Sequence, residues 1–194
     1  VILIHVFISL IYTTPWDNYL VAKHIWYYDP TRISGVILGY VPIEEYVFFI
    51  LQSLLSGLWT WFGYLSIPQP KKKLNIHPKY NLLPFFLLLP AIISIINLLI
   101  GTKASHYSSL IFVWAFLPIF IQWLFGLDIL LKNAKFFLIS SIPVTLYLWI
   151  VDGVAITNGV WEINPKYIYG ISFFHLPFEE AMFFFLTNVI ICGG

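Results

Sequence analysis

The sequence PIEEYVFF fills residues 42–49, and a related sequence, PFEEAMFF, fills residues 177–184. In both, a proline precedes two adjacent glutamates, and the glutamates run directly into a long apolar stretch. Proline suits the first position of a helix, and acidic residues in the first turn complement the helix dipole. Each stretch therefore predicts the start of a helix that carries two carboxyl groups into apolar surroundings.

The composition indicates what those surroundings are. Of the 194 residues, 60% are hydrophobic, 20% are aromatic and only 10% are charged. Soluble domains are about half apolar and a quarter charged, so this chain has too little polar surface to coat a water-soluble globule. It is predicted to be a multi-pass integral membrane protein. The net charge of +1 and the absence of a basic patch with interleaved aromatics argue against nucleic-acid binding. Cys192, the single cysteine, excludes an internal disulfide.

Six apolar stretches are long enough for a spanning helix, which takes about 20 residues. They cover Val1–Ala22, Pro42–Leu65, Leu82–Ile100, Ser108–Leu131, Phe136–Ile156 and Ile171–Cys192. The predicted fold is an all-α polytopic transmembrane helix bundle. Because the first stretch begins without a methionine, we expect a further helix upstream, which gives about seven in the full chain.

An internal repeat appears when the chain is shifted by 135 residues. Between positions 17 and 51, 11 of 35 residues are identical to their counterparts, whereas this composition would give about 2 or 3 by chance. The identities begin at Asp17/Asp152 and include Trp26/Trp161 and both glutamate pairs. Duplication for packing alone is an alternative, but packing does not require buried acids twice.

The number of spans between the two units predicts how they are oriented. Four spans separate the start of one unit from the start of the next, so the units form a parallel repeat about an axis along the membrane normal. We predict a first, N-terminally truncated repeat at 1–66 and a second repeat at 107–194. Residues 67–106 are expected to supply a basic loop, with Lys71–Lys73, and a linker transmembrane helix.

The acidic residues of the two units are expected to meet. Asp17 lies about 11 residues, or ~16 Å, before the turn at Tyr28, and Glu44 lies about 8 residues, or ~12 Å, after Val36. The same depths hold in the second unit. Six carboxyl groups can therefore converge on one layer of the membrane, from Asp17, Glu44, Glu45, Asp152, Glu179 and Glu180.

Adjacent glutamates lie about 100° apart on a helix, so one is expected to face a cavity while the other caps or orients it. Dry, crowded surroundings disfavour the ionised form, which suits a glutamic acid to general-acid catalysis. An isolated copy of this motif would indicate an ordinary helix start. A magnesium or manganese site is a further alternative, but no histidine lies at helical spacing from the glutamates, and we predict no metal. No dinucleotide or phosphate-binding motif is present, and no cofactor is predicted.

The aromatic residues divide into two predicted groups. The first is typical of a membrane-interface belt and comprises Trp26, Tyr27, Tyr28 and Trp161. The second lies near the acids, where ring faces could bind substrate and stabilise a cation, and comprises Phe48, Phe49, Phe183, Phe184 and Trp149.

These motifs resemble the membrane-integral carotenoid cyclases, the heterodimer-type lycopene β-cyclases. The stretches that resemble the fused form found in archaea and fungi are WDN at 16–18 through Pro30, GYVPIEEY at 39–46 and HLPFEE at 175–180. The family pattern implies two three-helix repeats joined by an extra helix, here Leu82–Ile100. One departure is Val151, where the first unit has Trp16 and where Trp149 is the nearest replacement.

The resemblance implies a reaction. A glutamic acid would protonate the terminal double bond of lycopene, the next double bond would close a six-membered ring, and loss of a proton would leave a β-end. This is an intramolecular lyase or isomerase reaction without a cofactor, acting on lycopene and γ-carotene taken from the bilayer. Glu44, Glu45, Glu179 and Glu180 are the acid and base candidates, with Asp17 and Asp152 setting their protonation. Fusion to or association with a phytoene synthase is also implied.

Two alternatives stay open. Buried acids could carry protons in a proton-coupled transporter or channel, which would need a polar route to water on both sides. A different carotenoid end-group enzyme, such as a hydratase, would trap the same cation with water. A cyclase should instead have a long apolar tunnel that is open to lipid and has acids at its closed end.

Overall fold

The computed structural model describes residues 1–66 and 82–194. Its helices are α1 (Ile2–Ala22), α2 (Ile43–Ser66), α3 (Leu88–Ile100), α4 (His106–Lys132), α5 (Ala134–Thr157) and α6 (Phe178–Gly193). Three 3-10 helices are η2 (Leu83–Leu87), η3 (Lys103–Ser105) and η4 (Pro165–Tyr167). Six short strands are β1 (Trp26–Tyr28), β2 (Ile37–Leu38), β3 (Val41–Pro42), β4 (Trp161–Ile163), β5 (Ser172–Phe173) and β6 (Leu176–Pro177). The predicted basic loop at Lys71–Lys73 lies outside the described residues.

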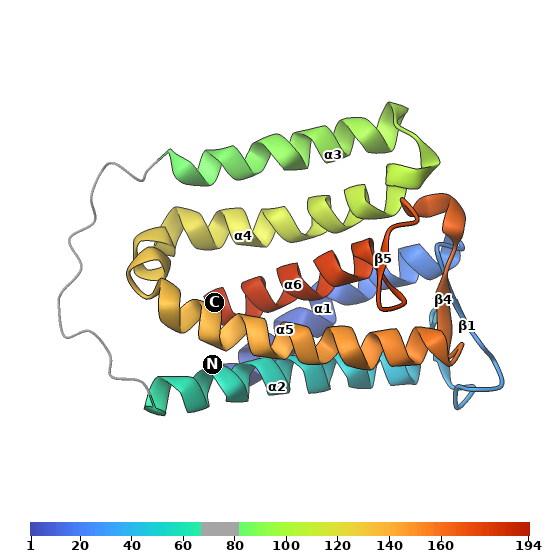
Figure 1. Cartoon of the computed structure of the whole chain (residues 1–194), viewed down its shortest axis with the longest axis horizontal. Coiled ribbons are helices and arrows are strands. Elements are labelled where there is room, and N and C mark those ends of the chain that lie inside the picture. Colours follow the sequence, from blue (N-terminus) through green and yellow to red (C-terminus); the bar gives the residue numbers. More distant parts are fainter. Residues whose placement is uncertain (67–81) are drawn as a thin grey trace.

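The helices form one bundle and run along its long axis (Figure 1). The connections that contain the strands gather at one end, and both ends of the chain lie toward the other (Figure 1). Helix α2 packs against α1, α5 and α6, while α6 also packs against α4 and α5. Helix α3 packs on the outside of α4. This arrangement confirms the predicted all-α helix bundle.

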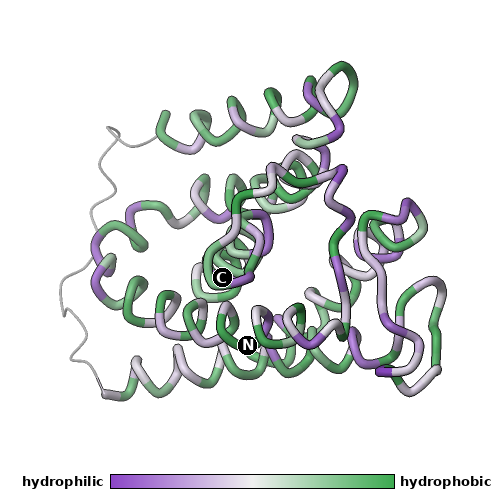
Figure 2. The backbone as a smooth tube through the Cα atoms, turned by 45° about the vertical axis from the view of Figure 1, so that its right-hand side comes forward, coloured by the Kyte–Doolittle hydropathy of each residue, from purple (hydrophilic) through white to green (hydrophobic). Residues whose placement is uncertain are grey.

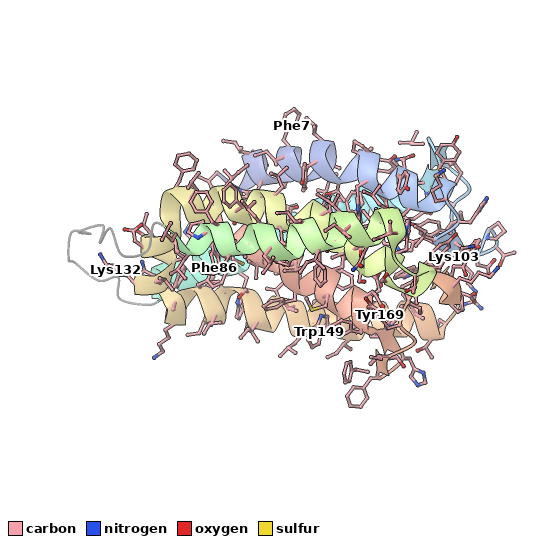
Figure 3. All side chains as sticks on the ribbon, turned by 90° about the horizontal axis from the view of Figure 1, so that it is seen from above. Phe7, Phe86, Lys103, Lys132, Trp149 and Tyr169 are labelled. Atoms are coloured by element: carbon pink, nitrogen blue, oxygen red, sulfur yellow. The ribbon has the colours of Figure 1, made fainter. Side chains whose placement is uncertain are left out.

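The bundle has an apolar exterior. Hydrophobic residues run along the helices, and the hydrophilic ones are more frequent toward the helix ends and connections (Figure 2). Lys132 and Lys103 mark opposite ends, and Phe7, Phe86 and Trp149 lie between them (Figure 3). Four helical stretches of the described chain are long and apolar enough to cross a membrane: Ile43–Ser66, Leu83–Ile100, Lys103–Lys132 and Ala134–Thr157.

The repeat that the sequence predicts is present in the backbone. The hairpin of β2 and β3 recurs 135 residues later as the hairpin of β5 and β6, with the same antiparallel register. The backbone hydrogen bond from Ile43 N to Val36 O, 2.9 Å long, has its counterpart between Phe178 N and Ile171 O at 2.9 Å. Gly35, at φ +81°, matches Gly170 at φ +75°. Each hairpin therefore delivers the chain to a glutamate-bearing helix in the same way.

Strands β1 and β4 join the two repeats. They pair antiparallel, with Tyr27 opposite Glu162 and Trp26 opposite Ile163. Tyr27 and Glu162 are themselves counterparts in the 135-residue shift, so the local two-fold axis passes through this pair. A two-fold axis between parallel repeats places equivalent residues on opposite sides of one centre. The two sets of acids therefore face each other across it.

The start predicted for the last helix was wrong. Residues 172–177 form the β5–β6 hairpin, and α6 begins only at Phe178. At the turn, Phe174 and His175 have φ values of +49° and +68°, in the left-handed region that a right-handed helix excludes. Apolar residues here reflect a hairpin at the end of an apolar bundle, which hydropathy does not distinguish from a helix. The domain boundaries at residues 66 and 106 stay a prediction.

A buried amide ties three helices together near the middle of the bundle. Asn188 of α6 is fully buried, and its Oδ1 accepts a hydrogen bond from Ser56 Oγ of α2 at 2.7 Å. Its Nδ2 donates to Thr145 Oγ1 of α5 at 3.0 Å and to Phe184 O at 3.0 Å. This network satisfies polar groups that would otherwise be costly to bury, and it fixes the relative positions of α2, α5 and α6.

We expect Asn188→Leu to lower the free energy of unfolding by about 1–3 kcal/mol, because it leaves the Ser56 and Thr145 hydroxyls without their partner. Stability would be measured by equilibrium unfolding in mixed micelles. Thr187→Val is the control, since the hydrogen bond found for Thr187 in the described chain runs to Phe183 O within α6. Equal stability of the two variants would contradict the bridging role.

Candidate functional site

The first glutamate of each pair binds the connection that precedes its helix. Glu44 Oε1 accepts a hydrogen bond from Ser34 N at 2.5 Å, and Glu179 Oε1 accepts one from Tyr169 N at 2.8 Å. Ser34 and Tyr169 are counterparts in the repeat, so the same contact is made twice. These two carboxyl groups therefore hold the hairpin connections against α2 and α6, and Glu44 also borders the cavity described next.

A cavity of about 200 Å³ lies between the two repeats. Its acidic lining comes from Glu44 and Glu45 of α2, Asp152 of α5 and Glu180 of α6. The rest of its wall is aromatic or aliphatic, and includes Trp26, Phe48, Leu148, Val151, Trp161, Phe183 and Phe184. Neither repeat builds this site alone, because Glu45 and Phe48 come from the first and Asp152 and Glu180 from the second.

Four carboxyl groups lie near one another toward the end of the bundle where α2 and α6 begin. Burial raises the pKa of the Tyr28 hydroxyl well above its ordinary value, and the nearby charges of Glu45, Asp17, Glu180 and Asp152 raise it further. Glu44 and Glu179 are not among these charges. Glu44 borders the same cavity as Glu45, Asp152 and Glu180, whereas Glu179 is not part of its wall. The convergence of all six acids on one site stays a prediction.

The inner acids have few hydrogen-bond partners. Tyr107 of α4 is fully buried and donates its hydroxyl to Glu180 Oε1. Trp161 Nε1 donates to Asp152 Oδ1 at 3.2 Å, but Asp152 Oδ2 has no partner in the described chain. Both oxygens of Asp17 are buried and likewise have no partner among the described residues. Four carboxyl groups that share one dry region cannot all be ionised.

Two tryptophans that the sequence analysis assigned to a membrane-interface belt line this cavity. Trp26 is only 3% exposed, and Trp26 and Trp161 pack edge to face with ring centroids 5.5 Å apart. Trp26 and Trp161 are identical positions of the repeat, and this identity was the sequence signal that could have assigned both to the shared site. Their pairing follows from β1 and β4, which bring the two rings together at the two-fold axis.

The predicted substrate-binding aromatics divide in the same way. Phe48, Phe183 and Phe184 line the cavity. Phe49 is buried against Tyr46 and Phe48 and is not part of the cavity wall. The Trp149 indole turns to α6, where Nε1 donates to Ala181 O at 2.9 Å, so it does not take the place that Trp16 has in the first repeat.

The two repeats carry side chains of different size at one equivalent position, Trp16 in the first and Val151 in the second. The Trp16 ring lies against Phe183 at 5.5 Å and against Trp114 of α4 at 5.2 Å, filling the side between α1, α4 and α6. Val151 occupies the equivalent position on α5 and is part of the cavity wall. The smaller side chain leaves space between α2 and α5, which is where the cavity lies.

Sequence reasoning missed Tyr107. It lies on α4, outside the 35-residue stretch in which the identities were found, and no local motif marks it. Its importance depends on α4 packing against α6, which hydropathy does not predict. Among the described residues, no group of three or more His, Cys, Asp or Glu is arranged to hold a metal ion.

Comparison with known proteins identifies relatives of the whole chain. The sequence model of the lycopene cyclase family matches residues 1–62 and 104–192. A protein named lycopene beta-cyclase from Halobacterium salinarum is 34% identical, and the match covers 96% of this chain and 77% of that protein.

Fungal relatives are longer. Proteins named bifunctional lycopene cyclase/phytoene synthase are 33% identical in Aspergillus oryzae and 35% identical in Phaeosphaeria nodorum, with 97% and 100% of this chain covered. The matches span 32% and 34% of those proteins. No solved structure matches. On the family match and the archaeal relative together, the chain belongs to the lycopene cyclase family.

Proposed function

We propose that this chain is a lycopene β-cyclase, which converts the open ψ-end of lycopene into a β-ring by acid-initiated cyclisation. The observation that carries the proposal is the cavity shared by the two repeats, where four carboxyl groups meet a wall of aromatic and aliphatic side chains. Family membership favours this activity over a transporter or a hydratase. The reaction is an intramolecular isomerisation, and its electron balance requires no oxidant or reductant.

The size of the cavity supports this reaction. An engineered apolar cavity of about 150 Å³ binds benzene, so a cavity of about 200 Å³ is suited to one six-membered ring. The long polyene must extend away from it. The site therefore suits one end group at a time, and γ-carotene, with one ring formed, would bind again by its other end.

The chemistry follows from the arrangement of acids. A carboxyl proton adds to C2 of the substrate and leaves a cation at C1; the C5=C6 bond attacks C1, which closes the ring and moves the cation to C5. Loss of the C6 proton to a carboxylate restores a double bond, so one proton enters and one leaves. Phe48, Phe183, Trp26 and Trp161 line the cavity, and their rings would stabilise the cation.

The hydrogen bonds favour different roles for the two inner glutamates. Glu180 Oε1 accepts the Tyr107 hydroxyl, which stabilises a carboxylate and suits Glu180 to receive the C6 proton. No hydrogen bond to the Glu45 carboxyl is found in the described chain, and Glu45 is assigned as the acid. Asp17 and Asp152 share the remaining protons of the cluster, and Tyr107 is a positioning residue.

The membrane placement and the partners are part of the same proposal. The four long apolar helices, with large hydrophobic side chains exposed along them, support a multi-pass integral membrane protein. Residues 1–66 and 107–194 are the two cyclase repeats, and 67–106 link them. The fused fungal relatives support fusion to or association with a phytoene synthase. No metal or cofactor is invoked.

Substitutions at the inner and outer glutamates should differ. In bacteria that accumulate lycopene, Glu45→Gln should lower cyclisation by about 10²–10⁴-fold, since it removes the general acid. Glu180→Gln should lower it similarly and divert the remaining product to hydrated or differently deprotonated end groups. Glu179→Gln, which alters a contact to backbone and lies outside the cavity wall, is the control and should keep most of the activity. Separation of pigments by chromatography, beside immunoblots for protein amount, measures all three variants.

Full cyclisation by Glu45→Gln would contradict the assigned acid. Hydroxylated carotenoids from the unaltered protein would instead indicate a hydratase. Unchanged lycopene with well-inserted protein would contradict the cyclase activity, and the proton-coupled transporter would then be tested by a proton-flux assay.

Tyr107→Phe should lower kcat by about 10–100-fold, because a hydrogen bond to a charged group contributes about 1.5–3 kcal/mol. KM should stay unchanged, since Tyr107 contacts Glu180 and is not part of the cavity wall. Tyr12→Phe is the control, as it removes a 2.7 Å hydrogen bond to Trp114 O on α4 outside the cavity. A parallel loss in both variants would show a general packing effect instead.

Val151→Trp should lower activity by about 10²-fold, because an indole placed as in Trp16 would fill the space that the end group needs. Leu138→Trp tests the same change at an exposed position of α5 outside the cavity and should leave activity intact. Activity of Val151→Trp equal to that of the unaltered protein would contradict the position of the site.

A further inference from the structure

A second, larger hollow lies on the other side of α5. It has a volume of about 770 Å³ and runs from Leu146 to Asn158 along one stripe of that helix. The hairpin residues 173–176 and Ala181 of α6 complete its wall. The proposed reaction makes no use of this space, which we call the α5 groove. It shares no lining residue with the cavity that holds the carboxyl groups.

In the first repeat, side chains occupy the position that is equivalent to the α5 groove. Tyr46, the counterpart of Ala181, donates its hydroxyl to Leu38 O at 2.9 Å. Asn18, the counterpart of Gly153, donates to the Tyr46 hydroxyl at 3.1 Å and accepts from Tyr40 N at 2.8 Å. The backbone follows the same path in both hairpins. The α5 groove is therefore open because the second repeat has Ala181 in place of Tyr46 and Gly153 in place of Asn18.

The hairpin turn shows the reciprocal exchange. A Cβ at Gly39 would lie 2.2 Å from Asn18 Oδ1, so the filled site requires glycine there. Its counterpart in the second repeat is Phe174, which is 98% exposed at the rim of the groove. In the second repeat the large side chain therefore lies at the edge of the groove and not inside it. The groove is open and has an aromatic residue at its rim.

The dimensions and polarity of the groove select an occupant. From Leu146 to Asn158 the helix rises about 18 Å, close to the ~15 Å hydrocarbon thickness of one membrane leaflet. Its volume is about five times that of a cavity that binds one benzene, so it suits a chain rather than a ring. Leu146, Ile150 and Val154 line it and are exposed, while Asn158 and His175 lie at the hairpin end.

We propose that the α5 groove binds the hydrocarbon chain of a membrane phospholipid, with the head group at Asn158 and His175. The bound chain takes the place that the Tyr46 ring has in the first repeat and supports the β5–β6 hairpin before α6. The inference rests on the proposed membrane placement and does not depend on the cyclisation chemistry.

Native mass spectrometry of protein purified with phosphatidylglycerol as the probe tests this directly. The unaltered protein should retain one lipid, and Ala181→Tyr, which restores the filling side chain, should retain none. Tyr46→Ala should open the first-repeat site and retain a second lipid, a gain that misfolding would not produce. Ile150→Trp should also expel the lipid, whereas Ile142→Trp, at an exposed position of α5 outside the groove, should not.

Lipid retained equally by Ala181→Tyr and Ile150→Trp would overturn the proposal. Retention of a carotenoid in place of phospholipid would overturn the ligand class. Flotation with phosphatidylglycerol vesicles separates the possible failures: a protein that does not float refutes the membrane placement and this site with it, while one that floats without a bound lipid refutes the site alone. If the protein proves not to cyclise lycopene, the number of lipids bound per protein should still be one, so failure of the proposed function can be told apart from failure of the lipid site.

Discussion

The pairing of β1 with β4 is the constraint on which the rest of the structure depends. It fixes the two-fold relation between the repeats at Tyr27 and Glu162, and so determines which residues of one repeat meet those of the other. Without it, each repeat would bring an aspartate and a glutamate into apolar surroundings with no shared site. With it, Glu45 of the first repeat lies in the same cavity as Asp152 and Glu180 of the second. Burial of several acids is unfavourable, and sharing protons among them reduces the number of charges that must be buried.

Duplication followed by divergence explains the remaining architecture. The outer glutamates keep the same backbone contacts in both repeats, at Ser34 and Tyr169. The two repeats differ inside. Trp16 corresponds to Val151, which leaves space for the cavity, and Tyr46 and Asn18 correspond to Ala181 and Gly153, which leave the α5 groove open on the far side of α5. By our proposals, the same backbone arrangement supplies a reaction site between the repeats and a lipid site in the second repeat.

Much of this could be predicted from the sequence, because the residues that carry it are rare in an apolar chain. Proline before paired glutamates marked the starts of α2 and α6, and the 135-residue shift revealed the repeat. What could not be predicted depended on packing between distant segments. Tyr107 reaches Glu180 only because α4 lies against α6, and Trp149 turns away from the acids to bind Ala181 O. Hydropathy also extended the last helix into residues 171–177, since a hairpin at the end of an apolar bundle is as hydrophobic as a helix.

The central claim is that carboxyl groups buried between the repeats give a proton to a hydrocarbon. Cyclisation of lycopene by the reconstituted protein in deuterated water tests it most directly, with mass spectrometry of the product. Exchangeable carboxyl protons become deuterons, so the account predicts one deuterium retained per ring formed, at C2. Rings that form without deuterium would contradict proton donation from these acids.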